Sequence, residues 1–400
     1  MTTPPAYERD PYLTVLDTEI VDTGLADGRP WVVLADTVLY PEGGGQPCDL
    51  GRIGAHTVTA VGRAGGVVRH FVDGAPKTGP VRVTLDWERR FDHMQQHTAQ
   101  HLLTAVAADR FSWPTTAFHL GTRVSDVELD TPAVPEARLR ELEEAVAAEV
   151  RAARPVTAFR VDPHDLPGLG VRSRGLPADH TGDVRLVRIE GVDVNTCGGT
   201  HVRSTAEIEA VALLATEPMR GGTRLTFVAG RRVRGRLARH EARNAELRTL
   251  LGAPDDELAA VVGLRADQQR EAERRLGSAE DELARALATA LAAESATVVG
   301  AHFPDRDMGF LARLARLAAV AAPDKALLLT AGPESGGVFA LVLGDGLTAD
   351  PRELGTMVAA TMSGRGGGSG RVFQGKAGDL GRRGAALAAL RTALGGPDGP

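Results

Sequence analysis

Short apolar runs alternate with turn residues over the first 90 positions of the chain. The runs are rich in Val and Thr, and Gly, Asp or Pro stands between them. This pattern is typical of short strands joined by turns, and several such strands form a small barrel or sandwich. We therefore predict a small β-barrel over residues 1–90. The predicted strands are residues 13–24, 30–40, 66–74 and 79–87.

The hydrophobic period changes after residue 90. Residues 91–110 contain no Gly or Pro, and Phe91, Met94 and Ala105 recur at helical spacing. This pattern predicts a helix, and a second amphipathic helix is predicted over 135–155. Apolar runs of strand length surround both helices, so we expect an α+β domain over residues 91–231. The predicted strands are two within 115–130 and one each at 157–163, 183–191 and 206–219.

The remaining sequence predicts a helical arm followed by an α/β module. Ala, Arg, Glu and Leu dominate residues 232–294, with a break expected at Gly252-Ala253-Pro254. Leucines at 276, 283, 287 and 291 favour a helical hairpin or coiled-coil arm. Over 295–400 we expect strands at 296–303, 325–332 and 336–344, a helix at 308–321, and a second helix that runs into a glycine loop within 350–380.

Two histidine-containing motifs are the candidate chemistry of the chain. His97 and His101 are four residues apart on the predicted helix, so their imidazoles share one face. Cys197 and His201 are also four apart, with glycines between them that allow a tight turn. Three imidazoles and one thiolate suit one tetrahedral zinc ion. Spacing alone leaves open whether His93 with His97 or His97 with His101 is the helical pair.

The same motifs carry a resemblance to a known family. HTAQHLL at 97–103 and CGGTHV at 197–202 resemble the editing domain of alanyl-tRNA synthetases and the free-standing alanyl-tRNA editing (AlaX) proteins of the long form. YPEGGGQPCDLG at 40–51 and FHLG at 118–121 match in the same order, as does the run at 184–208. The resemblance implies that the ligands are His97, His101, Cys197 and His201, which leaves His93 as a neighbour.

Further site residues follow from the resemblance. It places the glycine-rich loop of Gly43, Gly44 and Gly45 near the editing pocket, with Gln46 as a polar pocket residue. It also implies that His119 faces the bound aminoacyl group, whereas a lone histidine in a strand is otherwise a structural residue. Thr98 stands where a HExxH metalloprotease has its glutamate, and we expect Thr98, His119 and Gln46 to help read the substrate. Asp92, Glu128 and Asp179 are acidic residues near the motifs, among which the sequence selects no general base.

Charge and composition indicate which binding partners and which cellular compartment to expect. The formal net charge is −6, yet eight arginines stand against one acid between residues 220 and 243. Local basic patches of this kind neutralise phosphates, although a solvated arginine-rich surface is an equal explanation. The C-terminal region resembles the DHH-associated glycine-rich domain of alanyl-tRNA synthetases, and Arg365, Arg371 and Lys376 beside its glycines are predicted to contact tRNA. Two cysteines, no signal peptide and no apolar run of membrane-spanning length favour the cytoplasm.

The resemblance predicts an aminoacyl-tRNA hydrolase with one zinc ion per chain. Its substrates are expected to be tRNA(Ala) mischarged with serine or, as a second candidate, glycine. No adenylate-forming synthetase core precedes the barrel, so we expect hydrolysis of the ester in trans. A non-catalytic tRNA-binding or RNA-binding protein and a zinc hydrolase of a small ester are the alternatives. The helical arm and the C-terminal domain are the candidate surfaces for a homodimer.

Overall fold

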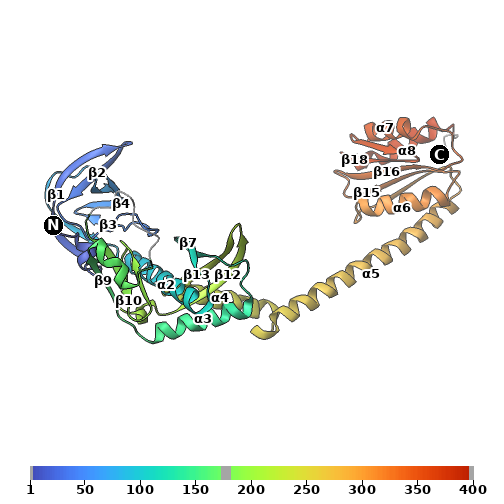
Figure 1. The fold of residues 1–400 in the computed structure, drawn as a ribbon. Coiled ribbons are helices and arrows are strands. Elements are labelled where there is room, and N and C mark those ends of the chain that lie inside the picture. The colour runs from blue at the N-terminus through green and yellow to red at the C-terminus, as the bar shows by residue number, and fades with distance from the viewer. Residues whose placement is uncertain (1–2, 173–181, 396–400) are drawn as a thin grey trace. The chain divides into compact units, whose positions relative to one another are not determined.

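The computed structural model describes residues 3–172 and 182–395. These residues form two compact units, Met1–Glu246 and Leu247–Pro400, and each unit has its own hydrophobic core (Figure 1). Both units combine helices with sheets, which confirms the mixed α+β class. No helix within the described ranges is both long enough and apolar enough to cross a bilayer. Asp179 lies outside these ranges.

Six strands at the N-terminal end of the first unit close into a barrel. Their order around it is β1-β2-β5-β4-β3-β6. Ile20, Val32 and Val83 fill its interior, as the alternating pattern requires. The predicted barrel is confirmed, but β3 and β4 were not predicted, because β3 is short and small residues interrupt the apolar pattern of β4. The elements are α1 (Ala6–Arg9), β1 (Val15–Ala26), β2 (Arg29–Leu34), β3 (Gly51–Ile53), β4 (His56–Ala64), β5 (Val67–Val72) and β6 (Gly79–Leu85).

Helix α2 (Trp87–Phe111) follows the barrel directly. It begins at Asp86, whose carboxylate accepts a hydrogen bond from the backbone N–H of Arg89 at 3.1 Å. Every residue from His93 to Leu103 is buried, so the middle of the helix is enclosed on all sides. The predicted helix at 91–110 is thus confirmed and starts four residues earlier than expected.

Two antiparallel sheets and helix α3 enclose α2. One sheet has the order β12-β13-β8-β7 and the other the order β11-β10-β9. Leu103 of α2 shares a single core with Phe227 of the first sheet, Val187 of the second and Val146 of α3. The elements are β7 (Thr115–Leu120), β8 (Ser125–Leu129), α3 (Glu136–Arg151), β9 (Val156–Val161), η1 (Pro163–Leu169), β10 (Val184–Ile189), β11 (Asp193–Thr196), η2 (Thr205–Ile208), β12 (Val211–Met219) and β13 (Gly222–Ala229).

Two sequence predictions in this part need correction. The strand expected at 206–219 begins only at Val211, because Ser204 caps a 3₁₀ turn over Thr205–Ile208. Strand β13 was not predicted, although it pairs with both β12 and β8 and lies in the middle of its sheet. Strand β12 directly precedes it and forms a hairpin with it, whereas β8 comes from a distant part of the sequence, and a local pattern does not show this second partner.

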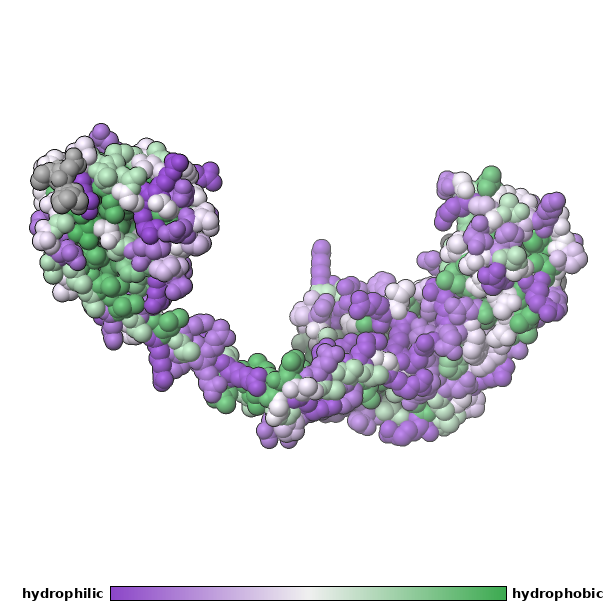
Figure 2. Space-filling view, turned by 180° about the vertical axis from the view of Figure 1, so that it is seen from behind, coloured by the Kyte–Doolittle hydropathy of each residue, from purple (hydrophilic) through white to green (hydrophobic). Residues whose placement is uncertain are grey.

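A long helical segment leads into the second unit. It consists of α4 (Arg231–Leu251), the short η3 (Asp255–Glu257) and α5 (Leu258–Ala293), so the predicted break at 252–254 is confirmed. Helix α4 has no buried residue. Leu287 and Leu291 of α5 pack against the core beneath α6, whereas Leu276 is 60% exposed. Figure 2 shows hydrophilic and hydrophobic residues along this helix.

The second unit has a five-stranded sheet covered on both faces. The strand order is β14-β15-β16-β18-β17, and only β14 and β15 are parallel. Leu327 of β15 packs with α6, and Leu328 packs on the opposite face with α7 and α8. The elements are β14 (Val298–Phe303), α6 (Met308–Ala321), β15 (Ala326–Ala331), β16 (Gly337–Leu343), α7 (Pro351–Thr361), β17 (Arg365–Ser369), β18 (Val372–Ala377), η4 (Leu380–Arg382) and α8 (Arg383–Ala393).

The glycine loop expected after α7 is instead a β-hairpin. Gly366, Gly367 and Gly368 lie in β17 and pair with β18, and none of them has a positive φ angle. Glycines weaken an isolated strand, but here the antiparallel ladder keeps them extended. The hairpin places Arg365 directly opposite Lys376.

Candidate metal centre

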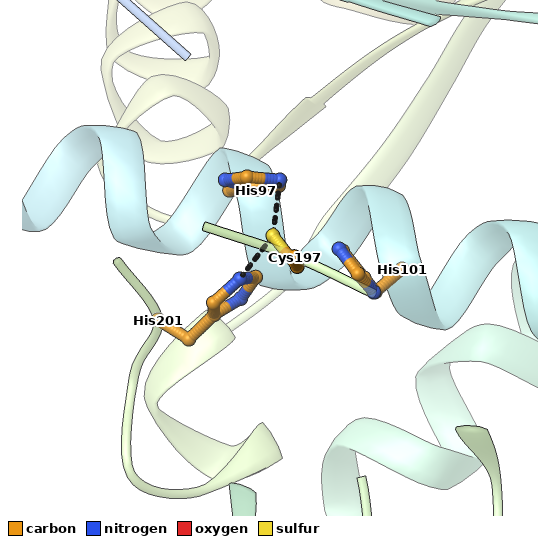
Figure 3. A group of neighbouring side chains, drawn as sticks. All are labelled: His97, His101, Cys197 and His201. Carbon is orange, nitrogen blue, oxygen red and sulfur yellow. Dashed lines mark hydrogen bonds between the residues drawn. The ribbon is translucent and has the colours of Figure 1, made fainter. Parts of the chain in front are cut away.

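Four side chains from two distant parts of the sequence meet beside α2. His97 and His101 project from the helix, and Cys197 and His201 come from the segment that follows β11 (Figure 3). One donor atom from each lies within 4.8 Å of all the others. The Cys197 sulfur is 3.5 Å from His97 Nε2 and 3.3 Å from His201 Nε2. A tetrahedral zinc with usual bond lengths holds sulfur and nitrogen ligands about 3.5 Å apart, so the spacing fits such an ion.

The outer nitrogen of each imidazole has a partner of its own. His97 Nδ1 is 2.8 Å from Gln46 Oε1, His101 Nδ1 is 3.2 Å from Asp193 Oδ2, and His201 Nδ1 is 3.1 Å from Thr98 Oγ1. A proton on Nδ1 satisfies each of these contacts and leaves the Nε2 lone pair available for an ion. Metal-binding histidines are commonly oriented in this way.

The charge state of Cys197 also suits a metal ligand. Burial by itself raises the pKa of this thiol, but the neighbouring imidazoles of His97 and His201 outweigh it and hold the pKa well below its ordinary value. Burial lowers the pKa of His201 to about 3, so that imidazole is neutral. Burial also lowers the pKa of His101, but its hydrogen bonds with Asp193 and Cys197 outweigh burial and raise the pKa to about 10, so binding of an ion at this ring releases a proton. The cluster thus offers a thiolate at Cys197 and a neutral imidazole at His201, which are the forms that bind zinc.

Glycines let the two loops of the site approach their neighbours. A Cβ atom on Gly199 would lie 2.3 Å from His97 Cε1, so no larger residue fits between Cys197 and His201 at this position. Gly45 has a φ of +77°, and a Cβ atom there would lie 2.6 Å from the Phe118 ring. Both positions thus require glycine for close contact.

The cluster opens on a cavity of about 640 Å³. His97, His101 and Cys197 form part of its wall, with Gly44 and Gly45 of the glycine-rich loop. Its apolar lining includes Phe118, Ala117, Pro114 and Ala108, and its polar lining includes Gln100, Thr104, Thr115, Asn195 and Arg172. The cavity thus combines an apolar part with polar groups that could orient a ligand, as small-molecule sites do.

Gln46 and Thr98 lie behind the imidazoles and do not line this cavity. Gln46 is fully buried, accepts from the backbone N–H of Thr200 at 3.1 Å and donates to the Thr200 hydroxyl at 2.9 Å. Thr98 donates to the carbonyl of Met94 at 2.8 Å. Both residues therefore position histidines in this structure. Gly43 also stays out of the lining, and its N–H bonds to the carbonyl of Gln46.

His119 is not brought into the cavity. Its side chain is 63% exposed and is paired with Asp126 at 2.9 Å across strands β7 and β8. Successive residues of a strand face opposite sides, so Phe118 takes the cavity side and His119 the other. His119, Asp126 and Glu128 form a second group of ligand-type residues, but Arg224 is ion-paired with Glu128 at 2.7 Å.

The remaining predicted site residues are either ion-paired or exposed. Asp92 is ion-paired with Arg232 at 2.7 Å, so it is not a free general base. Arg365 and Lys376 are exposed on the hairpin of the second unit. Arg371 is ion-paired with Asp345 at 3.0 Å and donates to two backbone carbonyls.

Sequence reasoning missed Asp193, Gln100 and Arg172. Asp193 stands four residues before Cys197, and this short spacing was the available signal. Gln100 stands beside His101 on the helix, but the cavity that it lines is completed by residues of β7 and β11, which are distant in the sequence. Arg172 lines the cavity and is ion-paired with Asp193 at 3.1 Å, but its position 21 residues before Asp193 in the sequence gave no signal of this.

Comparison with known proteins places the chain in a family. Residues 184–234 match the threonyl and alanyl tRNA synthetase second additional domain. The alanyl-tRNA editing protein Aarsd1 of Danio rerio is 37% identical over 368 residues, which cover 90% of this chain and 87% of that protein. This chain belongs to the family of alanyl-tRNA editing proteins. The resemblance found in the sequence is thereby confirmed.

Other alanyl-tRNA editing proteins and a ligase match as well. Aarsd1 of Mus musculus is 38% identical over 365 residues, with 90% of this chain and 87% of that protein covered. The alanine–tRNA ligase of Ignicoccus hospitalis is 32% identical over 249 residues, which are 59% of this chain but only 27% of the ligase. This editing protein thus corresponds to a limited part of that ligase.

Proposed function

We propose that this editing protein is a trans-acting deacylase that hydrolyses the ester between a wrongly attached amino acid and tRNA(Ala). Serine is the principal amino acid and glycine the second. One observation carries the proposal: His97, His101 and Cys197 lie in the wall of a cavity of about 640 Å³, large enough for an amino acid and part of a terminal ribose. The family supports tRNA(Ala) as the substrate.

The four-residue cluster would hold one zinc ion. The donor set and the 3.3 and 3.5 Å separations from sulfur to nitrogen support zinc over a hard cation, which prefers oxygen ligands. When bound, the ion supplies positive charge and Lewis acidity at the cavity wall. Gln46, Thr98 and Asp193 hold the imidazoles in place. Because His97 and His101 also line the cavity, their orientation sets its shape.

Gln100 supports the selection of serine. It is 4% exposed, lines the cavity, and donates to Thr104 Oγ1 at 2.9 Å. Its carbonyl oxygen is buried without a hydrogen-bond partner among the described residues. A buried acceptor without a donor is costly, and a serine hydroxyl donates to it where the methyl group of alanine does not. Gln100 therefore recognises serine by its hydroxyl group, which alanine lacks.

A second, hydrolytic site corrects errors that an alanine-binding pocket cannot avoid. A binding pocket for alanine rejects a substrate that merely adds a hydroxyl by only about a hundredfold, and the smaller glycine enters it freely. Hydrolysis in a site that favours the hydroxyl restores the discrimination against serine. Arg365 and Lys376, two cations opposite each other on an exposed hairpin, are proposed to contact the tRNA body, together with Arg371 at the turn of the same hairpin.

Two further expectations belong to this proposal. The exposed Leu276 of α5 and the C-terminal domain are the candidate surfaces for a homodimer. The cytoplasm is the compartment that fits the tRNA substrate.

The proposal is tested by comparing two esters of serine. Purified wild-type protein should release serine from Ser-tRNA(Ala) and leave serine ethyl ester intact at the same concentration. Equal turnover of the two esters would favour a zinc hydrolase of small esters instead. Retention of Ser-tRNA(Ala) without any release would favour a non-catalytic RNA-binding protein.

A further inference from the structure

A second cavity, of about 780 Å³, lies beside the start of α4. It is formed by the first turns of α2, the turn between β7 and β8, and the first turns of α4, and it shares no lining residue with the cavity at the metal centre. Six of its lining residues are arginines. They are Arg89, Arg123, Arg231, Arg232, Arg236 and Arg239.

Ion pairs account for only part of this positive charge. Glu88 is paired with Arg231, and Asp92 is paired with Arg232. The third lining carboxylate, Asp86, caps helix α2 by accepting from the backbone of Arg89. The pairs thus neutralise two of the six guanidinium groups, and a single further carboxylate stands against the other four.

Three arginines of this cavity have no acidic partner among the described residues. In the part of the chain that the structure describes, no ion pair involves Arg123, Arg236 or Arg239, and all three are exposed. These three residues line the cavity from two separate elements, the β7–β8 turn and α4. Packing does not explain the position of the two on α4, because this helix has no buried residue.

One ring nitrogen of a buried histidine in the cavity wall also lacks a hydrogen-bond partner among the described residues. His93 is 3% exposed and lines the cavity, and its Nδ1 atom has no hydrogen-bond partner within the described ranges. Burial lowers the pKa of His93 to about 4, so the ring is neutral at pH 7. It is not part of the metal cluster. Buried polar atoms are nearly always paired, so an unpaired one points to a missing ligand.

We propose that this cavity binds a phosphate group of the RNA backbone near the acceptor end of the tRNA. Guanidinium groups bind phosphate oxygens through paired N–H donors, and a neutral imidazole supplies one further N–H. His93 precedes His97 by one turn of α2, about 6 Å along the helix, so the phosphate lies close to the residues that face the ester. The assignment to tRNA rests on the proposed function; the binding of a phosphate rests on the cavity alone.

The test measures binding of uncharged tRNA(Ala) to the full chain over a range of salt concentrations. Arg236→Gln/Arg239→Gln removes two unpaired cations from the cavity. The matched control, Arg140→Gln/Arg151→Gln, removes two exposed arginines of α3 that lie outside both cavities. We expect the cavity variant to bind about tenfold more weakly near physiological salt, with a salt slope smaller by about 1 to 2, and the control to stay within about twofold. Equal affinities for the two variants would overturn the inference.

Two further arms locate the phosphate and identify its source. An acceptor-stem minihelix should show the same loss of affinity, and a loss seen only with full-length tRNA would contradict a site near the acceptor end. Inorganic phosphate, compared with chloride at equal ionic strength, should weaken RNA binding by the wild type and not by the cavity variant. Phosphate binding combined with unchanged tRNA affinity of the variant would mean a site for free phosphate and would overturn the assignment to RNA.

The result of this binding test does not depend on hydrolysis, because the tRNA carries no attached amino acid. A protein that hydrolyses Ser-tRNA(Ala) while both variants bind alike would refute this inference and leave the proposed function standing. If the cavity variant binds RNA more weakly but the wild type hydrolyses no aminoacyl-tRNA, this inference stands and the proposed function is refuted.

Discussion

Asp193 Oδ2 lies 3.2 Å from Nδ1 of His101, and both side chains are at most 5% exposed. The other carboxylate oxygen is 3.1 Å from Nε of Arg172, so one buried carboxylate joins a candidate metal ligand to an arginine of the cavity wall. This contact fixes the orientation of the imidazole and the nitrogen that carries its proton.

Replacing this carboxylate should weaken metal binding. We expect Asp193→Asn to lower zinc affinity about 10- to 100-fold, because the amide orients His101 less firmly and is a poorer acceptor for its N–H. Competition with a zinc chelator measures the affinity. Asp109→Asn is the control, since Asp109 also bonds Arg172 but contacts no imidazole of the cluster. Equal zinc affinity in the two variants would contradict this role of Asp193.

Adjacent glycines of the CGGTH segment should differ in their tolerance of a methyl group. Gly199→Ala places Cβ 2.3 Å from His97 Cε1 and 2.8 Å from Gln46 Oε1, whereas a Cβ atom on Gly198 meets no other atom within 4 Å. We expect Gly199→Ala to lose about tenfold or more in zinc affinity and Gly198→Ala to keep its zinc. Metal content after dialysis checks this, and similar content in both variants would argue against the close contact at Gly199.

Removal of the unpaired acceptor in the cavity should change selectivity. We expect Gln100→Leu to lower kcat/KM for Ser-tRNA(Ala) about 10- to 100-fold, because the serine hydroxyl then enters an apolar wall without a partner. Hydrolysis of Gly-tRNA(Ala), which has no hydroxyl, should change less than about threefold. The two substrates are assayed side by side. A parallel fall in both rates would mean that Gln100 supports the site as a whole and does not read serine.

The four candidate metal ligands can be predicted from the sequence, whereas the hydrogen bonds that other residues make to them cannot. The i, i+4 spacing of His97 and His101 is a local property of a helix, and the glycines before His201 mark a tight turn. The hydrogen bonds of Gln46 and Asp193 to the imidazoles join residues 51 and 92 positions apart. Such contacts depend on how the barrel and the sheets pack around α2, and no local pattern specifies this packing.

Two positions show what a local sequence pattern does not specify. His119 stands in a strand, and the alternation of a strand predicts that Phe118 and His119 face opposite sides but not which of them faces the cavity. The glycines at 366–368 read as a loop, yet pairing with β18 makes them a strand. In the first case the packing of β7 beside α2 decides which residue faces the cavity, and in the second the pairing of β17 with the neighbouring β18 makes the glycines a strand. The barrel, α2 and the break after α4 follow local patterns, and these were predicted.

A buried histidine in the barrel should make its stability depend on pH. Burial lowers the pKa of His70 from 6.5 to about 4, and its ring contacts Thr37 and the carbonyl of Val32. Between these two pH values the unfolded chain takes up a proton that the folded chain does not, so stability is complete above pH 6.5 and falls as the pH drops towards 4. The expected loss is about 3 kcal/mol.

His70→Gln should remove this part of the pH dependence. Urea unfolding followed by tryptophan fluorescence measures it, since all three tryptophans lie in the first unit. The free energy of unfolding of the wild type should fall by about 3 kcal/mol more than that of the variant between pH 7 and pH 4. Parallel pH profiles would show that His70 is protonated in the folded barrel.

The central claim is that the Cys197 cluster makes this editing protein a metal-dependent deacylase. Its most direct test measures release of serine, glycine and alanine from tRNA(Ala), together with bound zinc, for the wild type, Cys197→Ala and Cys48→Ala. Cys48 is the matched control, because it is the other cysteine of the chain and lies in the barrel core. We predict fast release of serine with alanine spared, loss of both zinc and activity in Cys197→Ala, and retention of both in Cys48→Ala. Full activity of a zinc-free Cys197→Ala protein would contradict the account.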